Sequence, residues 1–216
     1  MSDPVTLELR EQFATVEQQR LTSSVGIWLF LMTEVMMFGG LFVAYTVYRF
    51  NHPQAFAEGS SSMDILLGSI NSAILLTSSL IMAFAEVSAK LGRQRLLTIL
   101  LLITILMGLA FLGIKFTEYY EHYQQHEAPG VWFNHSGPLA PGVQMFYVFY
   151  FIMTGLHAAH MIIGIFLILG LIFRNFIGSL SANYHTPVSV VGLYWHFVDI
   201  VWIFLYAIFY LPGLYK

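Results

Sequence analysis

Five long runs of apolar residues follow one another along the chain, separated by short polar segments. They cover approximately residues 25–50, 64–91, 96–122, 143–173 and 188–211. Each run reaches the roughly 20 residues that an α-helix needs to cross a hydrocarbon core about 30 Å thick. Inside lipid, a helix satisfies its own backbone hydrogen bonds. The pattern therefore predicts an all-α fold, an integral membrane bundle of five transmembrane helices.

The chain outside these runs is too short for a second large domain. We expect residues 1–24 to form a polar cytoplasmic N-terminal segment and residues 25–216 to form one five-helix transmembrane domain. The composition agrees, because 57% of the 216 residues are hydrophobic and only 10% are charged. The mean hydropathy of +0.71 is also far above that of a soluble domain of this size. No extramembrane part is left to hold a soluble catalytic site.

Several function classes are excluded by what the sequence lacks. Zero cysteines exclude disulfides, thiolate metal sites and iron–sulfur ligation by this chain. The sequence has no phosphate-binding loop, dinucleotide fingerprint, nucleophile elbow or zinc-protease helix. Its nine Lys and Arg residues are too few for nucleic-acid binding. The function is therefore expected in or beside the bilayer.

Basic residues gather at one set of helix ends, which predicts the orientation in the membrane. The side of the N-terminus carries Arg10, Arg20, Lys90, Arg93, Arg95 and Arg174, and the other side carries only Arg49 and Lys216. Loops that stay in the cytoplasm are enriched in Lys and Arg. We therefore predict a cytoplasmic N-terminus and an external C-terminus.

Ionisable residues occur inside three of the apolar runs, close to the expected bilayer midplane. They are Glu34 in the first run, His157 and His160 in the fourth, and His196 and Asp199 in the fifth. A charge at mid-membrane costs at least about 2.5–3.5 kcal/mol on insertion scales, so such residues face other helices or a cavity. His157 and His160 are three residues apart, so they share a helix face, and the same holds for His196 and Asp199. We predict a buried functional carboxylate at Glu34 and an intramembrane polar cluster of the other four residues.

The residues alone leave several roles open for this cluster. The side chains can hydrogen-bond across helices and fix the packing, at about 0.6 kcal/mol per average bond. They can hold a phospholipid headgroup or line a lipid-filled cleft, or they can relay protons or ions. A haem between His157 and His160 is disfavoured, because residues three apart on one helix cannot bind opposite faces of one haem. No carboxylate or thiolate shares their stripe, so no metal site is predicted.

Two oppositely charged pairs lie toward the ends of the helices. Lys115 and Glu118 are three residues apart, and Glu86 and Lys90 are four apart, so both are candidate ion pairs. Long charged side chains near a helix end extend toward the membrane surface. We interpret both pairs as snorkelling pairs at opposite surfaces.

Five segments in order resemble subunit III of the haem–copper respiratory oxidases, in the short five-helix bacterial form of the cytochrome c oxidase subunit 3 family. The segments are GIWLFLMTEVMMF at 26–38, NSAILLTSS at 71–79, KFTEYY at 115–120, TGLHAAH at 154–160 and YWHFVDIVW at 194–202. Glu34 matches the family's buried membrane carboxylate. His157, His160, His196 and Asp199 match its other intramembrane polar positions.

The resemblance implies a subunit without a redox centre in the bacterial plasma (inner) membrane. Its direct partner would be subunit I, beside subunit II and further small subunits or a respiratory supercomplex, with haem and copper in subunits I and II. The implied roles are to stabilise subunit I, to support proton uptake, and to provide lipid and oxygen access through a phospholipid-filled V-shaped cleft. The implied complex reduces O2 to water and pumps protons, with cytochrome c as the expected electron donor.

The chain departs from the long form of the family, which has seven helices, because it starts at the equivalent of the third. The V-shaped cleft then needs a second wall from another subunit. Alternatives are an accessory subunit of a quinol oxidase or of a nitric oxide reductase, which neighbouring genes would distinguish. An independent proton-coupled transporter is a further alternative, but transporters tend to have internal repeats and broken helices, which this sequence lacks.

Overall fold

The computed structural model describes residues 12–130, 133, 137–181 and 184–214, so Arg10 and Lys216 lie outside the described residues. The elements are α1 (Val16–Asn51), α2 (Pro53–Ser61), α3 (Ile65–Lys90), α4 (Gln94–Gln124), α5 (Ala140–Phe176), α6 (Thr186–Phe209) and the short 3-10 helix η1 (Leu211–Leu214). Five helices are long and apolar enough to span a membrane. In the described part of the chain the only β-type pairing is one isolated bridge, between Ser181 and Tyr184. The predicted all-α membrane fold is confirmed.

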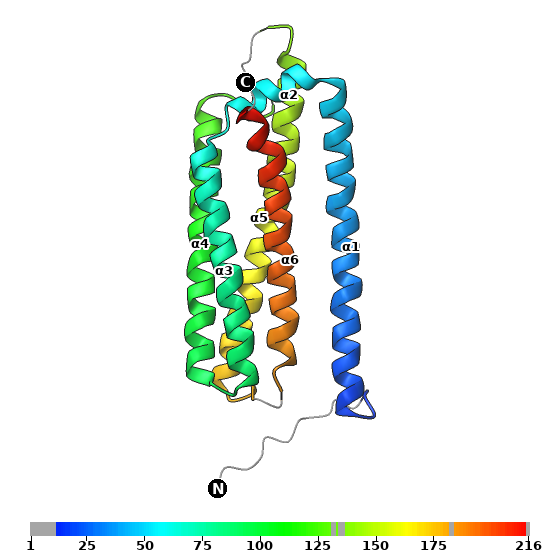
Figure 1. Ribbon diagram of the computed structural model, residues 1–216, viewed down its shortest axis with the longest axis vertical. Helices are drawn as coiled ribbons and strands as arrows, with labels where there is room; N and C mark the ends of the chain where they lie inside the picture. The colour runs from blue at the N-terminus through cyan, green and yellow to red at the C-terminus, as the bar shows by residue number, and fades with distance from the viewer. Residues whose placement is uncertain (1–11, 131–132, 134–136, 182–183, 215–216) are drawn as a thin grey trace.

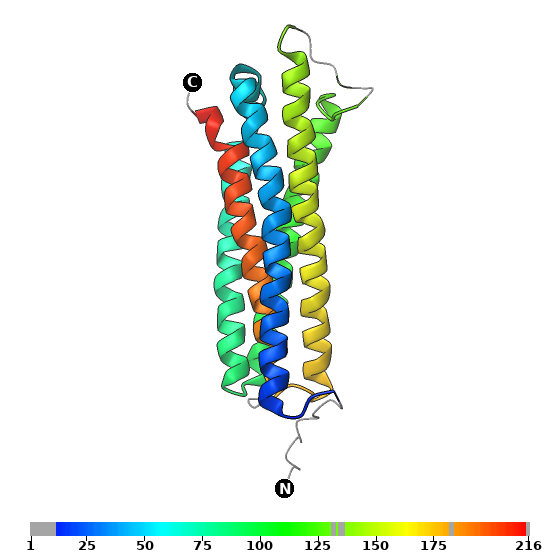
Figure 2. The same ribbon diagram turned by 90° about the vertical axis from the view of Figure 1, so that its right-hand side faces the viewer.

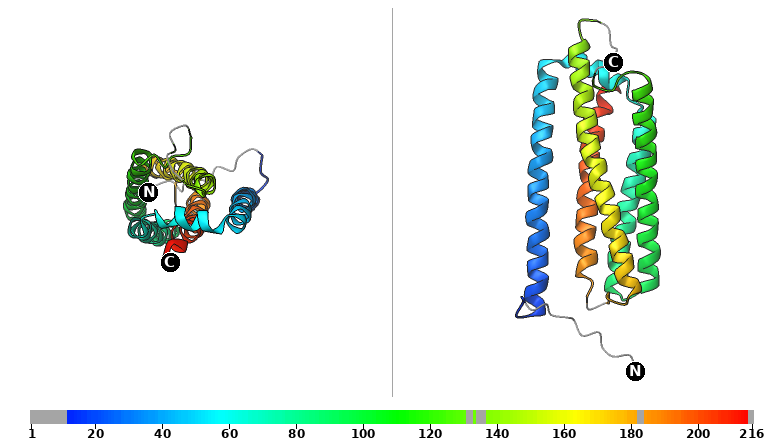
Figure 3. Two further views of the ribbon diagram at one scale, coloured as in Figure 1. Left: turned by 90° about the horizontal axis from the view of Figure 1, so that it is seen from above. Right: turned by 180° about the vertical axis from the view of Figure 1, so that it is seen from behind.

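Helices α3 to α6 form a compact bundle, and α1 runs beside it (Figure 1). Seen from above, the four bundle helices enclose a common interior, and α1 lies outside them next to α6 (Figure 3). The side view shows α1 along the outer face of α6 (Figure 2). Its apolar side chains remain open to lipid or to a partner, since Trp28 is 59% exposed and Met36 is 73% exposed.

The turns between the helices follow local signals in the sequence. Asp64 caps α3, because its Oδ1 accepts hydrogen bonds from the backbone N–H groups of Leu66 and Leu67. Gly92 has φ of +69° directly after α3, a conformation that glycine adopts without the strain of a side chain. The resulting tight turn places α3 and α4 side by side along their whole length.

Helix α2 is an element that the apolar pattern did not predict. Pro53 occupies its first turn, where the missing N–H is not needed. One face of α2 packs on the bundle end, with Phe56 buried and the Ser60 hydroxyl donating to the Phe209 carbonyl at 2.7 Å. A methyl group at Gly142 would come within 2.5 Å of the Ala55 side chain, so α2 and α5 are in close contact. This contact fixes the upper end of α1 relative to the bundle.

Most of the described basic residues gather at one end of the molecule. Arg20 lies near the start of α1, Lys90 at the end of α3, Arg95 at the start of α4 and Arg174 at the end of α5. All four of these helix ends lie at the lower end of Figure 1. The up-and-down topology therefore gives the one-sided charge distribution on which the predicted orientation depends.

Candidate functional site: the buried polar groups

A single polar contact joins the middle of α1 to α5. Glu34 Oε2 lies 3.1 Å from His160 Nε2, and these side chains are only 15% and 10% exposed. His160 Nδ1 lies 2.8 Å from the Leu156 carbonyl, so this nitrogen donates its proton there. The Glu34–His160 bond then needs one further proton, carried by either the carboxyl or the imidazole. The Tyr194 hydroxyl donates to the His160 carbonyl at 3.0 Å and holds α6 at the same place.

His157 does not join this contact, although it lies three residues before His160. Its imidazole lies inside the four-helix bundle, 5.5 Å from the Phe111 ring and 5.3 Å from the Trp202 ring between centroids, and the residue is 1% exposed. The two histidines therefore contact different neighbours. His160 faces α1, and His157 faces the interior between α4 and α6.

The two residues of the predicted cluster on α6, His196 and Asp199, lie toward α3. His196 Nδ1 lies 2.7 Å from the Ser79 hydroxyl. Asp199, one turn further on, is 3% exposed, and neither carboxylate oxygen has a hydrogen-bond partner among the described residues. Neither residue contacts Glu34. The predicted cluster is therefore divided between the α1–α5 contact and the bundle interior, and the described part of the chain contains no group of His, Asp and Glu that could hold a metal ion.

Lys115 and Glu118 form an ion pair, but it is not a snorkelling pair. Lys115 Nζ lies 3.0 Å from Glu118 Oε2, and the side chains are only 3% and 2% exposed. The reason is that α4 continues to Gln124, so Lys115 lies about 14 Å from the end of its helix at a rise of about 1.5 Å per residue. The pair is enclosed by the bundle and cannot reach the water at the membrane surface.

Two tyrosines complete the hydrogen bonding of this ion pair. Lys115 Nζ donates to the hydroxyls of Tyr150 and Tyr210 at 2.8 Å each. Both hydroxyls in turn donate to Glu118 Oε1. Every ammonium hydrogen thus has an acceptor, and rings of Tyr150 and Trp202 lie 4.8 and 5.2 Å from the ammonium. Neither tyrosine could be identified from the sequence, because nothing in their local pattern distinguishes them from membrane-interface tyrosines.

The second pair lies at the opposite end of the bundle. Lys90 Nζ is 2.8 Å from Glu86 Oε1, and the Lys90 side chain is 50% exposed. The Ser189 hydroxyl donates to the same carboxylate oxygen at 2.9 Å. Glu86 therefore links the end of α3 to the start of α6 while Lys90 extends outward.

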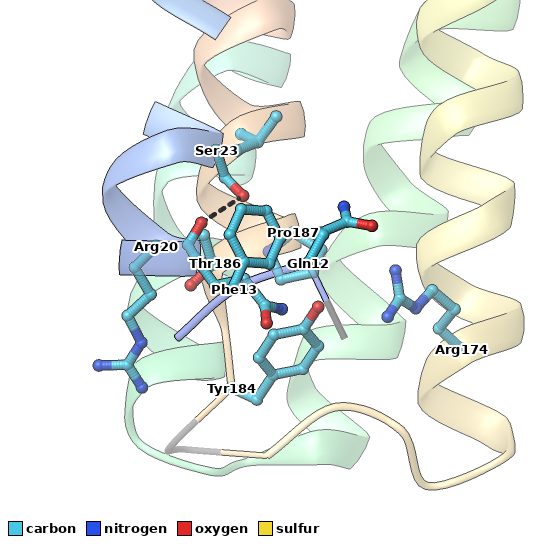
Figure 4. A pocket seen from close by; sticks show the side chains of 10 residues that line it. Gln12, Phe13, Arg20, Ser23, Arg174, Tyr184, Thr186 and Pro187 are labelled. Carbon is cyan, nitrogen blue, oxygen red and sulfur yellow. Dashed lines mark hydrogen bonds between the residues drawn. The ribbon is translucent and has the colours of Figure 1, made fainter. Parts of the chain in front are cut away.

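A pocket of about 370 Å³ opens at this end of the molecule, between the start of α1 and the segment that joins α5 to α6. Figure 4 shows Arg20 and Arg174 on either side of it, with Tyr184 and Phe13 between them. The Arg174 guanidinium lies 5.7 Å from the centroid of the Tyr184 ring. Two guanidinium groups beside an apolar wall suit the phosphate and upper acyl chains of a phospholipid.

The fold and these contacts define a helical membrane protein in which Glu34 and the Lys115–Glu118 pair make polar contacts to neighbouring helices. Residues 12–214 match the family model for cytochrome c oxidase subunit III. The chain therefore belongs to this family, and it is a subunit III of the haem–copper respiratory oxidases, which are multi-subunit membrane complexes.

Individual relatives include oxidases named for two different electron donors. The chain is 35% identical over 190 residues to cytochrome c oxidase subunit 3 of Thermostichus vulcanus, covering 87% of this chain and 86% of the relative. It is 32% identical to cytochrome c oxidase subunit 3 of Bacillus subtilis, covering 98% and 91%. It is 30% identical to quinol oxidase subunit 3 of Bacillus spizizenii, covering 88% and 87%.

Proposed function

We propose that this chain is the accessory, non-catalytic subunit III of a proton-pumping terminal oxidase that reduces O2 to water in a bacterial inner membrane. Family membership over nearly the whole chain carries the proposal. The polar contacts agree with it, because Glu34–His160 joins α1 to α5, and the Lys115–Glu118 pair of α4 hydrogen-bonds Tyr150 of α5 and Tyr210 at the end of α6. Haem and copper belong to subunits I and II, and subunit I is the direct partner.

Cytochrome c is the proposed electron donor, since the relatives named as cytochrome c oxidases include the 35% identical protein of Thermostichus vulcanus. A quinol oxidase is the second candidate, because a quinol oxidase subunit 3 matches at 30% over a similar share of the chain. The donor site lies on other subunits, so this chain serves either complex with the same fold.

A role in lipid binding rests on the pocket between α1 and the α5–α6 connection. Arg20 and Arg174 place two positive charges at the end of the molecule that we propose to be cytoplasmic. Anionic headgroups are attracted to such basic positions at the cytoplasmic surface. Phospholipid held there would lie between α1 and the bundle and provide the lipid and oxygen access expected of the subunit. Support of proton uptake by subunit I would follow from contact at this same surface.

The test of the proposed function is co-purification of the tagged full-length chain in a mild detergent, followed by an absorption spectrum and identification of its companions. We expect haem bands, a subunit I and a copper-bearing subunit II, with bound phospholipid in the extract. A quinol-oxidising complex without copper in subunit II would support the second candidate. A colourless chain recovered alone would overturn the oxidase proposal.

Replacement of Glu34 by Gln is expected to leave assembly and initial O2 reduction largely intact. Glutamine can still hydrogen-bond His160, and an intramembrane hydrogen bond contributes about 0.6 kcal/mol on average and at most about 1.7. Subunit stoichiometry on gels and O2 uptake by the purified complex measure the two effects. Glu17→Gln, at an exposed position in the first turn of α1, is the matched control. Immediate loss of O2 reduction in assembled Glu34→Gln complex would contradict the supporting role.

A further inference from the structure

Three polar side chains inside the four-helix bundle have no hydrogen-bond partner in the described part of the chain. They are Asn71 on α3, His157 on α5 and Asp199 on α6, which are 0%, 1% and 3% exposed. Both amide atoms of Asn71, both ring nitrogens of His157 and both carboxylate oxygens of Asp199 are unpaired. Three helices thus present unpaired polar groups in the same membrane interior.

His157 contacts Trp202, and Asn71 and Asp199 lie close to it along their helices. The Trp202 ring contacts the His157 imidazole, and its Nε1 donates at 3.1 Å to the hydroxyl of Ser72, the neighbour of Asn71. Asp199 precedes Trp202 by three residues and shares its side of α6. The contacts of Trp202 therefore relate the three helices at one level of the bundle.

The polar protein groups described near Trp202 cannot satisfy all of these atoms. The ammonium of Lys115, 5.2 Å from the Trp202 ring, already donates to one carboxylate and two hydroxyls. The Ser79 hydroxyl, which is near Asp199 and bonded to His196, has a single proton and can satisfy at most one of the two carboxylate oxygens. Buried polar groups in proteins have partners in nearly every case, and in a membrane interior bulk water cannot supply them.

The missing partner must both donate and accept hydrogen bonds. An amide offers donors and an acceptor, a neutral imidazole offers one of each, and a carboxylate accepts. A metal cation would satisfy only the acceptors. Water meets all these requirements and usually makes about three hydrogen bonds in buried sites.

We propose that the interior of the α3–α6 bundle binds ordered water molecules that bridge Asn71, His157 and Asp199 beside Trp202. These waters form an internal hydration site between the helices of the bundle. The site is separate from the Glu34–His160 contact, which faces α1, and from the completed Lys115 network. It does not depend on the electron donor or on the lipid pocket.

X-ray hydroxyl-radical footprinting of the intact oxidase complex in lipid nanodiscs tests this proposal, because radicals form from water next to the side chain that they modify. Phe111 contacts His157 and Trp202, whereas Phe146 packs among Phe56, Tyr147 and Phe209, and both phenylalanines are 0% exposed. We expect Phe111 to be modified several-fold faster than Phe146. Equal, slow modification of the two rings would show a dry interior and overturn the proposal.

An Asn71→Leu variant provides a second, independent test. With bridging water present, the variant removes a partner of that water, so modification of Phe111 falls several-fold and the complex loses this chain at a lower temperature. In a dry interior, the variant removes an unpaired amide and the complex becomes more resistant to heat. Asn51→Leu, at the exposed end of α1, is the matched control. Increased heat resistance of Asn71→Leu would therefore overturn the hydration site even where Phe111 labelling was fast.

Discussion

Replacement of Lys115 by Met is expected to lower the free energy of unfolding by about 3–5 kcal/mol, as measured for other buried ion pairs that lose one partner. The Glu118 carboxylate would stay enclosed, with the Tyr150 and Tyr210 hydroxyls but without its counter-charge. Unfolding of the purified chain in mixed detergent micelles, followed by circular dichroism, measures the change.

Two comparisons separate the lost charge from the lost packing. Lys115→Met combined with Glu118→Gln should recover much of the stability, because a neutral, well-packed replacement of a whole buried pair is often tolerated. Lys90→Met, which removes the half-exposed partner of Glu86, should change the free energy of unfolding by only about 0–1 kcal/mol. Equal losses for Lys115→Met and Lys90→Met would show that the Lys115 network does not stabilise the bundle.

The long helices could be predicted from the sequence, because a long apolar run that crosses a membrane satisfies its backbone hydrogen bonds by forming a helix. Helix α2 could not, since its nine residues include Gly59 and two serines and carry only a short apolar face. What stabilises α2 is contact with distant residues, such as the Ser60 hydrogen bond to Phe209. Such contacts depend on how helices far apart in the sequence come together.

The same limit applies to the polar groups. Sequence spacing placed His157 and His160 on one helix face, but the position of α1 decides that only His160 meets Glu34. For Lys115 and Glu118 the spacing predicted the pair, whereas the length of α4 decides that it is buried. Residue type and spacing therefore identified the charged side chains, and helix packing decides their partners.

Helix α1 is joined to the bundle mainly at its middle and upper end. The Tyr45 hydroxyl donates at 2.7 Å to the Ile208 carbonyl, and the Glu34–His160 contact lies below it. Further down, the pocket of about 370 Å³ lined by Arg20 and Arg174 lies between α1 and the end of α5. This arrangement agrees with the proposed lipid position, because α1, which would border the lipid, contacts the bundle at places away from the pocket.

Replacement of Trp195 by Ala is expected to lower the free energy of unfolding by about 3 kcal/mol, the lower end of the range for large-to-small changes of aromatic residues. In lipid the loss comes from packing contacts more than from the hydrophobic effect. Trp195 is 0% exposed and lies between two glycines, since a methyl group at Gly108 would come within 2.9 Å of the indole and one at Gly164 within 3.0 Å. Its Nε1 also donates to the Ser78 hydroxyl at 3.1 Å.

Trp28→Ala is the matched control, because Trp28 is 59% exposed on α1 and its removal leaves no cavity. In the purified chain we expect it to change stability by much less than Trp195→Ala, under the same detergent titration. Because Gly108 belongs to α4 and Gly164 to α5, Trp195 of α6 joins three helices at one point. Similar effects of the two tryptophan changes would mean that this contact does not fix the bundle, and that α3 to α6 are held mainly by their polar groups.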